Sequence, residues 1–195
     1  MSLSTQQKIL QVTRQQFAIT GYEGIKMRQL AALAGIAPSV LYHYFANKDE
    51  LLKAVYLDTS HELGRKRAAL KPESSFKEML KSRIAFQFQH AESIVAVIKY
   101  YLHFRKDFKT NRLGHLPEKT YLHIEEVLQA GESQGIYHFP HLGREAKVIV
   151  HAINGYILEF FPATILLTER TELVDGIADF ILRALEPYRT RKSLI

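Results

Sequence analysis

Several side chains that can bind a partner gather in the segment 38–44, PSVLYHY. If the segment is helical, Leu41 and Phe45 lie four positions apart and face inward. Hydroxyl and imidazole groups among the remaining side chains can donate and accept hydrogen bonds, and a valine offers an apolar contact. The outward positions, which we predict to be available to a partner, are Ser39, Val40, Tyr42 and His43.

A second short helix is predicted just before this segment, over 27–34, because apolar residues recur there at helical spacing. Gly35 can take the left-handed conformation that ends a helix, and Pro38 suits the first turn of the next. Two short helices about three residues apart are expected to cross steeply, which is the pattern of a helix-turn-helix. The buried stripe of the first helix is predicted to be Met27, Leu30, Ala31 and Ala34.

Only helical patterns occur along the rest of the chain, so we predict an all-α fold. A first amphipathic helix spans about 4–20 and stops at Gly21, and Asn47 is a predicted N-cap. The best boundary is the polar segment 71–75. The remaining predicted helices span 48–67, 75–90, 92–105, 118–134, 143–166 and 170–186.

The composition excludes several classes of protein. The 195 residues include no cysteine, so disulfides and thiolate chemistry are impossible. The longest apolar runs are far shorter than the roughly 20 residues of a membrane span, and no signal segment opens the chain. We therefore expect a soluble cytoplasmic protein with no membrane partner.

No motif of an enzyme appears either. The chain has no GxSxG, HExxH, GxGxxG or phosphate-loop sequence. His138 and His141 are close in sequence, but without Cys or a carboxylate at ligand spacing we expect no metal site. We predict a protein that is not an enzyme and that needs no cofactor.

The positive charge is concentrated at the N-terminal end. Residues 1–72 contain ten Lys or Arg against five Asp or Glu, whereas residues 73–195 contain sixteen against fifteen. A basic module joined to a nearly neutral body is typical of polyanion binding, because cationic side chains on phosphates release condensed counterions. Solvated helix faces are the alternative explanation for the charge alone.

The first sixty residues closely resemble the DNA-binding module of the TetR family of bacterial transcription regulators. The resemblance in the rest of the chain is limited to the helical plan and the looser segment 124–137. Two helix caps depart from the family pattern, since Lys26 and Ala37 stand where Ser or Thr is usual. The matching positions are Ile9, Leu10, Phe17, Gly21, Tyr22, 28–37, 41–45 and 47–52.

The resemblance implies specific roles at double-stranded DNA. It assigns Pro38, Ser39, Val40 and His43 to base edges in the major groove, and Arg28, Tyr42, Tyr44 and Lys48 to backbone phosphates. Val40 replaces a residue that is frequently polar, which favours contact with a thymine methyl. Other interpretations stay open: Tyr44 as a core or interface aromatic, His43 as a solvated side chain, and Arg28 as a cover for its own helix.

The resemblance further implies that the C-terminal part binds a small effector. Fifteen of the 21 aromatic residues follow residue 60, and some of them could line a cavity for an apolar or aromatic ligand. Ordinary helix-bundle core is the alternative for each of them. The candidate ligand-binding residues are Phe86, Tyr101, His103, Phe104, Tyr121, His123, Asn154 and Phe160.

Apolar stripes on the last two predicted helices favour association of two copies of the chain. Two such helices from each subunit can form a four-helix bundle about a two-fold axis, although packing within the subunit would use part of these stripes. A homodimer would present two reading helices to a pseudo-palindromic operator. The candidate interface residues are Ile149, Ile153, Tyr156, Leu173, Ile177, Phe180, Ile181 and Ala184.

Together these patterns predict a helix-turn-helix domain over 1–47, a connecting helix and boundary over 48–72, and a ligand-binding and dimerisation domain over 73–195. The expected protein is a homodimeric, ligand-responsive DNA-binding regulator, and most simply a repressor. The alternative is a small-molecule-binding helical protein whose helix-turn-helix serves protein contacts.

Overall fold

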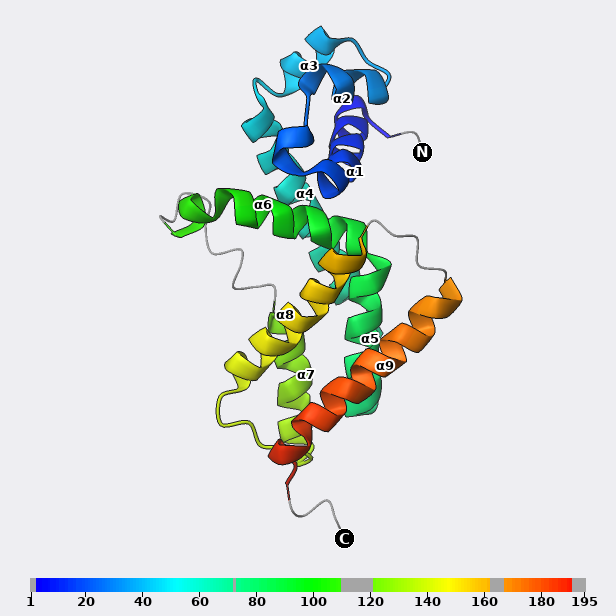
Figure 1. Cartoon of the computed structure of the whole chain (residues 1–195), viewed down its shortest axis with the longest axis vertical. Coiled ribbons are helices and arrows are strands. Elements are labelled where there is room, and N and C mark those ends of the chain that lie inside the picture. Colours follow the sequence, from blue (N-terminus) through cyan, green and yellow to red (C-terminus); the bar gives the residue numbers. More distant parts are fainter. Residues whose placement is uncertain (1–2, 72, 110–120, 162–166, 191–195) are drawn as a thin grey trace. The chain divides into compact units, whose positions relative to one another are not determined.

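The computed structural model describes residues 3–71, 73–109, 121–161 and 167–190, and throughout these ranges the regular elements are helices (Figure 1). One isolated β-bridge, between Tyr137 and Arg189, occurs within the described residues. The helices are α1 (Thr5–Gly24), α2 (Met27–Leu33), α3 (Pro38–Tyr44), α4 (Lys48–Ala68), α5 (Phe76–Gln89), α6 (Ala91–Lys109), α7 (Leu122–Ser133), α8 (Leu142–Phe160), α9 (Leu167–Leu185) and the 3₁₀ turn η2 (Glu186–Tyr188).

The predicted helices are confirmed, with differences at their ends. Gly21 interrupts α1 at a φ of 67°, as its predicted stop requires, but a further helical turn follows to Gly24. Helix α8 ends at Phe160, earlier than predicted, because Phe161 is extended and precedes a proline, which disfavours helical backbone. The predicted start of α7 at residue 118 lies outside the described residues.

Helices α1 to α4 form a compact unit together with α6. Arg14 of α1 ties this unit together, since its guanidinium lies 2.7 Å from a carboxylate oxygen of Glu62 on α4 and 3.4 Å from one of Glu92 on α6. Hydrogen bonding to Lys66, followed by that to Arg14, holds the pKa of Glu62 below its ordinary value despite partial burial. Helix α6 therefore groups with the N-terminal helices, whereas its place in the sequence predicted that it belongs to the C-terminal domain.

Helices α5, α7, α8 and α9 form the second unit. Its core includes Leu80, Ile84, Ile124, Leu128 and Ile153, which are all fully buried. Two ion pairs, Lys77 with Asp179 and Lys81 with Asp175, join α5 to α9. No helix within the described residues has the length and hydropathy needed to cross a membrane.

Candidate nucleic-acid interface

The geometry of α2 and α3 is that of a helix-turn-helix. Gly35 ends α2 at a φ of 68°, and the amide of Ile36 donates to the carbonyl of Ala31 across the turn. Leu41 and Phe45 are buried, as the sequence predicts. Because these two residues fix one face of α3 against the core, the opposite face must be exposed.

The residues predicted to meet DNA lie on that exposed surface with one partial exception. Lys48, at the first position of α4, is half-buried. Tyr44 is 39% exposed and contacts His43 edge-on, with ring centroids 5.6 Å apart, so it does not belong to the core. The exposed members of the set are Arg28, Pro38, Ser39, Val40, Tyr42, His43 and Tyr44.

The start of α4 is held by side-chain capping. The Oδ1 atom of Asn47 accepts a hydrogen bond from the amide of Glu50 at 2.9 Å, which confirms the predicted N-cap. The Glu50 carboxylate in turn accepts from the amide of Ala46 at 2.9 Å. By contrast, Lys26 and Ala37 make no side-chain cap, as expected from their residue types. Helix α3 thus relies on packing and on the well-capped α4 that follows it.

Lys48 is anchored by Tyr22, the residue that follows the interruption in α1. The Lys48 ammonium donates to the carbonyl oxygen of Tyr22 at 3.0 Å and lies 3.7 Å from the centroid of its ring. The Tyr22 hydroxyl donates to Asp49 at 2.6 Å. This hydrogen bond, followed by burial, raises the pKa of Tyr22 to about 12. The sequence indicated Tyr22 only as a position of the family pattern.

The predicted ligand-binding residues fall into two groups. Tyr101, His103 and Phe104 lie on α6 in the first unit, and the other five lie in the second. Two of the first group contact α1: His103 stacks on Tyr22, and Phe104 meets the same ring edge-on. Sequence reasoning could not assign them this place, because it follows only from the packing of α6.

The second group combines buried and exposed positions. Phe86 and His123 are buried, and the Nε2 atom of His123 lies 3.3 Å from the amide nitrogen of Gln87. Tyr121 and Asn154 are half-buried, and Phe160 is exposed. The Oδ1 atom of Asn154 is buried and has no hydrogen-bond partner among the described residues.

The predicted dimer residues lie on two different faces of α8 and α9. Ile149, Ile153 and Ile181 are buried within the subunit, whereas Phe180 is 63% exposed and Ala184 is exposed as well. Neighbouring helix positions differ by 100°, so a broad apolar arc serves the subunit core on one side and an outer surface on the other. The remaining members, Tyr156, Leu173 and Ile177, are half-buried.

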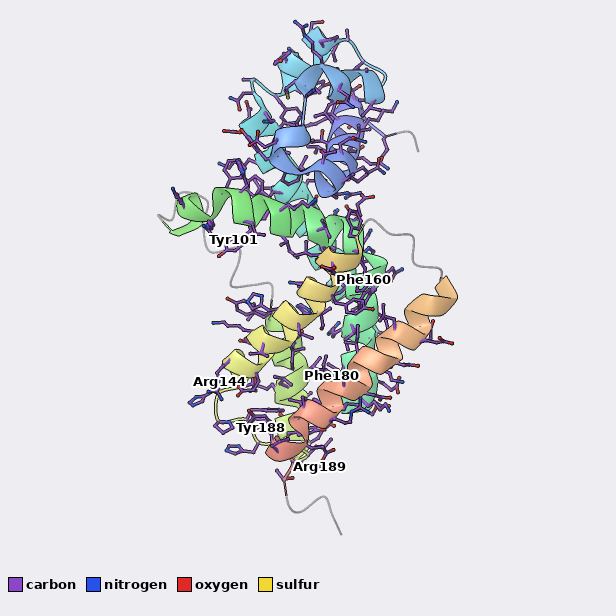
Figure 2. All side chains as sticks on the ribbon, in the orientation of Figure 1. Tyr101, Arg144, Phe160, Phe180, Tyr188 and Arg189 are labelled. Atoms are coloured by element: carbon purple, nitrogen blue, oxygen red, sulfur yellow. The ribbon has the colours of Figure 1, made fainter. Side chains whose placement is uncertain are left out.

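An apolar groove of about 310 Å³ runs between the outer faces of α8 and α9. Val148 is 64% exposed and lines this groove together with Phe180. Arg144 of α8 and Tyr188 lie at one end of this pair of helices (Figure 2), where both donate hydrogen bonds to the buried Glu145. Burial raises the pKa of Glu145, but these hydrogen bonds and one from its own backbone amide outweigh it, and the net shift is downward.

A helix-turn-helix with an exposed outer face, on a basic helical module, is typical of nucleic-acid-binding proteins. The family model of bacterial regulatory proteins, tetR family, matches residues 9–55. Among curated relatives, the HTH-type transcriptional regulator BetI of Brucella canis is 33% identical and that of a Brucella melitensis strain 32% identical, each over 94 residues. The N-terminal part of the chain, residues 9–55, therefore matches the TetR family of bacterial regulatory proteins.

The match to these relatives covers 46% of this chain and 48% of each relative, so the chain spans about half of their length. Solved structures extend the likeness of fold further. The fatty acid degradation regulator FadR of Bacillus halodurans is 20% identical, with a TM-score of 0.71 over 93% of this chain and 96% of that one. The TetR-family regulator PfmR of Thermus thermophilus is 22% identical, with a TM-score of 0.68 over 91% and 98%.

The cap at the start of α4 generates a prediction about stability. Replacing Asn47 by Ala removes the acceptor for the Glu50 amide and should lower the free energy of unfolding by about 1 kcal/mol. The Asn47→Ser variant keeps an oxygen at the cap and should stay close to the parent protein. Urea denaturation followed by circular dichroism measures both. Equal stability of the two variants would show that the Asn47 side chain does not cap α4 in solution.

Proposed function

We propose that the protein is a homodimeric transcription regulator that binds operator DNA through α3 and is released by a small ligand, acting as a repressor. The observation that carries the proposal is the exposed surface of α3, where every residue that the family pattern assigns to base edges faces solvent. The basic excess of residues 1–72 supports it, because phosphate neutralisation supplies essentially all of the non-specific affinity for DNA.

The first experiment is to measure binding to random duplex DNA at low salt by fluorescence anisotropy. A DNA-binding regulator should bind, and its affinity should fall steeply as salt increases. Absence of binding would favour the alternative in which the helix-turn-helix contacts a protein. Selection from a random duplex pool then identifies the operator.

For the effector we propose an apolar or aromatic small molecule bound in the second unit. Aromatic rings approach each other there. The ring centroids of Phe88 and Tyr156 are 6.0 Å apart, and those of Tyr156 and Phe160 are 4.5 Å apart. The buried Asn154 oxygen supports a polar anchor, because a buried acceptor is costly unless a donor reaches it. A ligand that favours one of two dimer geometries would change operator affinity by a coupling free energy of about 1–3 kcal/mol.

We further propose that the outer faces of α8 and α9 form the dimer interface. The apolar groove between these helices supports this, because large exposed apolar side chains favour association. A dimer is also what reading two half-sites requires, since they lie about 34–36 Å apart, one turn of B-DNA. The proposed contact residues are those that are exposed in the subunit: Val148, Ala152, Phe180 and Ala184.

Lys48 provides a test of phosphate contact. The Lys48→Ala variant should weaken binding to all duplexes alike and reduce the slope of log K against log[salt] by about 0.9 for the lost contact. Lys53→Ala is the matched control, because Lys53 is exposed on the same helix but is assigned no contact. Anisotropy titrations at several salt concentrations measure the slope. An identical slope for both variants would remove Lys48 from the phosphate contacts.

Base reading by Val40 and His43 is tested by comparing operator variants. Replacing either residue by Ala should reduce the preference at one or two base pairs by about 1–3 kcal/mol while leaving non-specific binding nearly intact. Tyr42→Phe should behave differently, since losing a phosphate donor weakens binding to every sequence. The idea fails if the Val40 and His43 variants lower all affinities uniformly.

The interface proposal predicts that Phe180→Glu yields monomers. The side chain is 63% exposed in the subunit, so the substitution should leave the fold intact, whereas an unpaired carboxylate buried in the dimer is costly. Operator binding should fall with dimerisation. Leu122→Glu, at an exposed apolar site on α7, should remain dimeric. Analytical ultracentrifugation at micromolar concentration measures the oligomeric state of each variant. If Phe180→Glu remains a dimer, the interface lies elsewhere.

A further inference from the structure

The Tyr22 ring is held on both faces by residues from different helices. Lys48 of α4 lies over it at 3.7 Å, and the His103 ring of α6 stacks on it at a centroid distance of 3.7 Å and an interplanar angle of 14°. Phe104 approaches the ring edge-on at 5.9 Å and 80°. Tyr22 thus forms part of a short chain of contacts from α6 to the first residue of α4.

The backbone around Tyr22 is fixed from α6 as well. The Lys99 ammonium donates to the carbonyl oxygens of Ala18 at 2.6 Å and Ile19 at 3.1 Å, just before Gly21 interrupts α1. Partial burial lowers the pKa of this ammonium. Phe104 interrupts the helical geometry of α6, with φ −96° and ψ 16°, directly after His103. Helix α6 therefore contacts the segment 18–22 at two points, through Lys99 and through His103.

Fixing Tyr22 restricts Lys48. An ammonium group has three N–H donors, of which one is used by the Tyr22 carbonyl, so donors remain for a phosphate oxygen. A lysine side chain ordinarily loses much conformational freedom when it binds, and ordering it beforehand reduces that loss. The ring also attracts the cation, and a stacked aromatic neighbour holds the ring in place.

We propose that Tyr22 and His103 are positioning residues of the DNA interface, which order the Lys48 ammonium for a backbone phosphate. Neither residue needs to touch DNA. The proposal rests on the DNA-binding function proposed above and names the contacts that order one of its phosphate-binding side chains.

The test is a double-mutant cycle in a duplex-binding assay. His103→Ala should weaken affinity about threefold to tenfold, as expected for loss of an aromatic contact that orders a binding group. The same change in a Lys48→Ala background should alter affinity less than about twofold, because its effect passes through Lys48. His103→Phe keeps an aromatic ring and should restore binding. Leu102→Ala, at a 51% exposed neighbouring position on α6, should bind like the parent protein.

A second measurement follows the contact without DNA. The Tyr22 ring current should shift the ε-methylene protons of Lys48 upfield in NMR spectra, and His103→Ala should move them toward the values of an ordinary lysine. Affinity that is unchanged in His103→Ala, or that falls equally in the Lys48→Ala background, overturns the proposal while leaving the DNA-binding function standing. A parent protein that binds no duplex refutes the function itself and the proposal with it.

Discussion

The burial of Leu41 and Phe45 is the constraint on which the candidate interface depends. Helix α3 has seven residues and no side-chain cap at Ala37, and a helix this short is not stable by itself in water. Its conformation must therefore come from packing, with one face fixed by these two side chains. Because the core dictates which face is inward, it also dictates which residues a partner can meet.

The same dependence on packing extends from α3 to α4 and α6. The Asn47 cap defines where α4 begins, and that point brings Lys48 against Tyr22. Arg14, through its ion pairs with Glu62 and Glu92, joins α1, α4 and α6 into one unit. Contiguous contacts thus join α6 to the start of α4.

The second unit shows how one helix serves two surfaces. Alternate sides of α8 and α9 supply the subunit core and an outer apolar groove, so the apolar arc is wider than packing within the subunit needs. Glu145 at the end of the groove is buried but paired, through Arg144 and Tyr188, which lowers the cost of placing a carboxylate there. An exposed arc of this kind is consistent with a partner that covers it.

The sequence by itself determined the helices, the turn at Gly35, the cap at Asn47 and the outward residues of α3, because each follows from local rules of periodicity, glycine conformation and capping. It did not determine which unit α6 joins, nor that His103 stacks on Tyr22 from 81 positions away. Nor did the sequence distinguish the buried face of α8 from its exposed face. Val148 and Ile149 are both apolar, but neighbouring helix positions point in directions 100° apart. Only the tertiary structure decides such matters, because they depend on which surfaces of distant helices fit together, and apolar patterning alone does not specify a helix's neighbours.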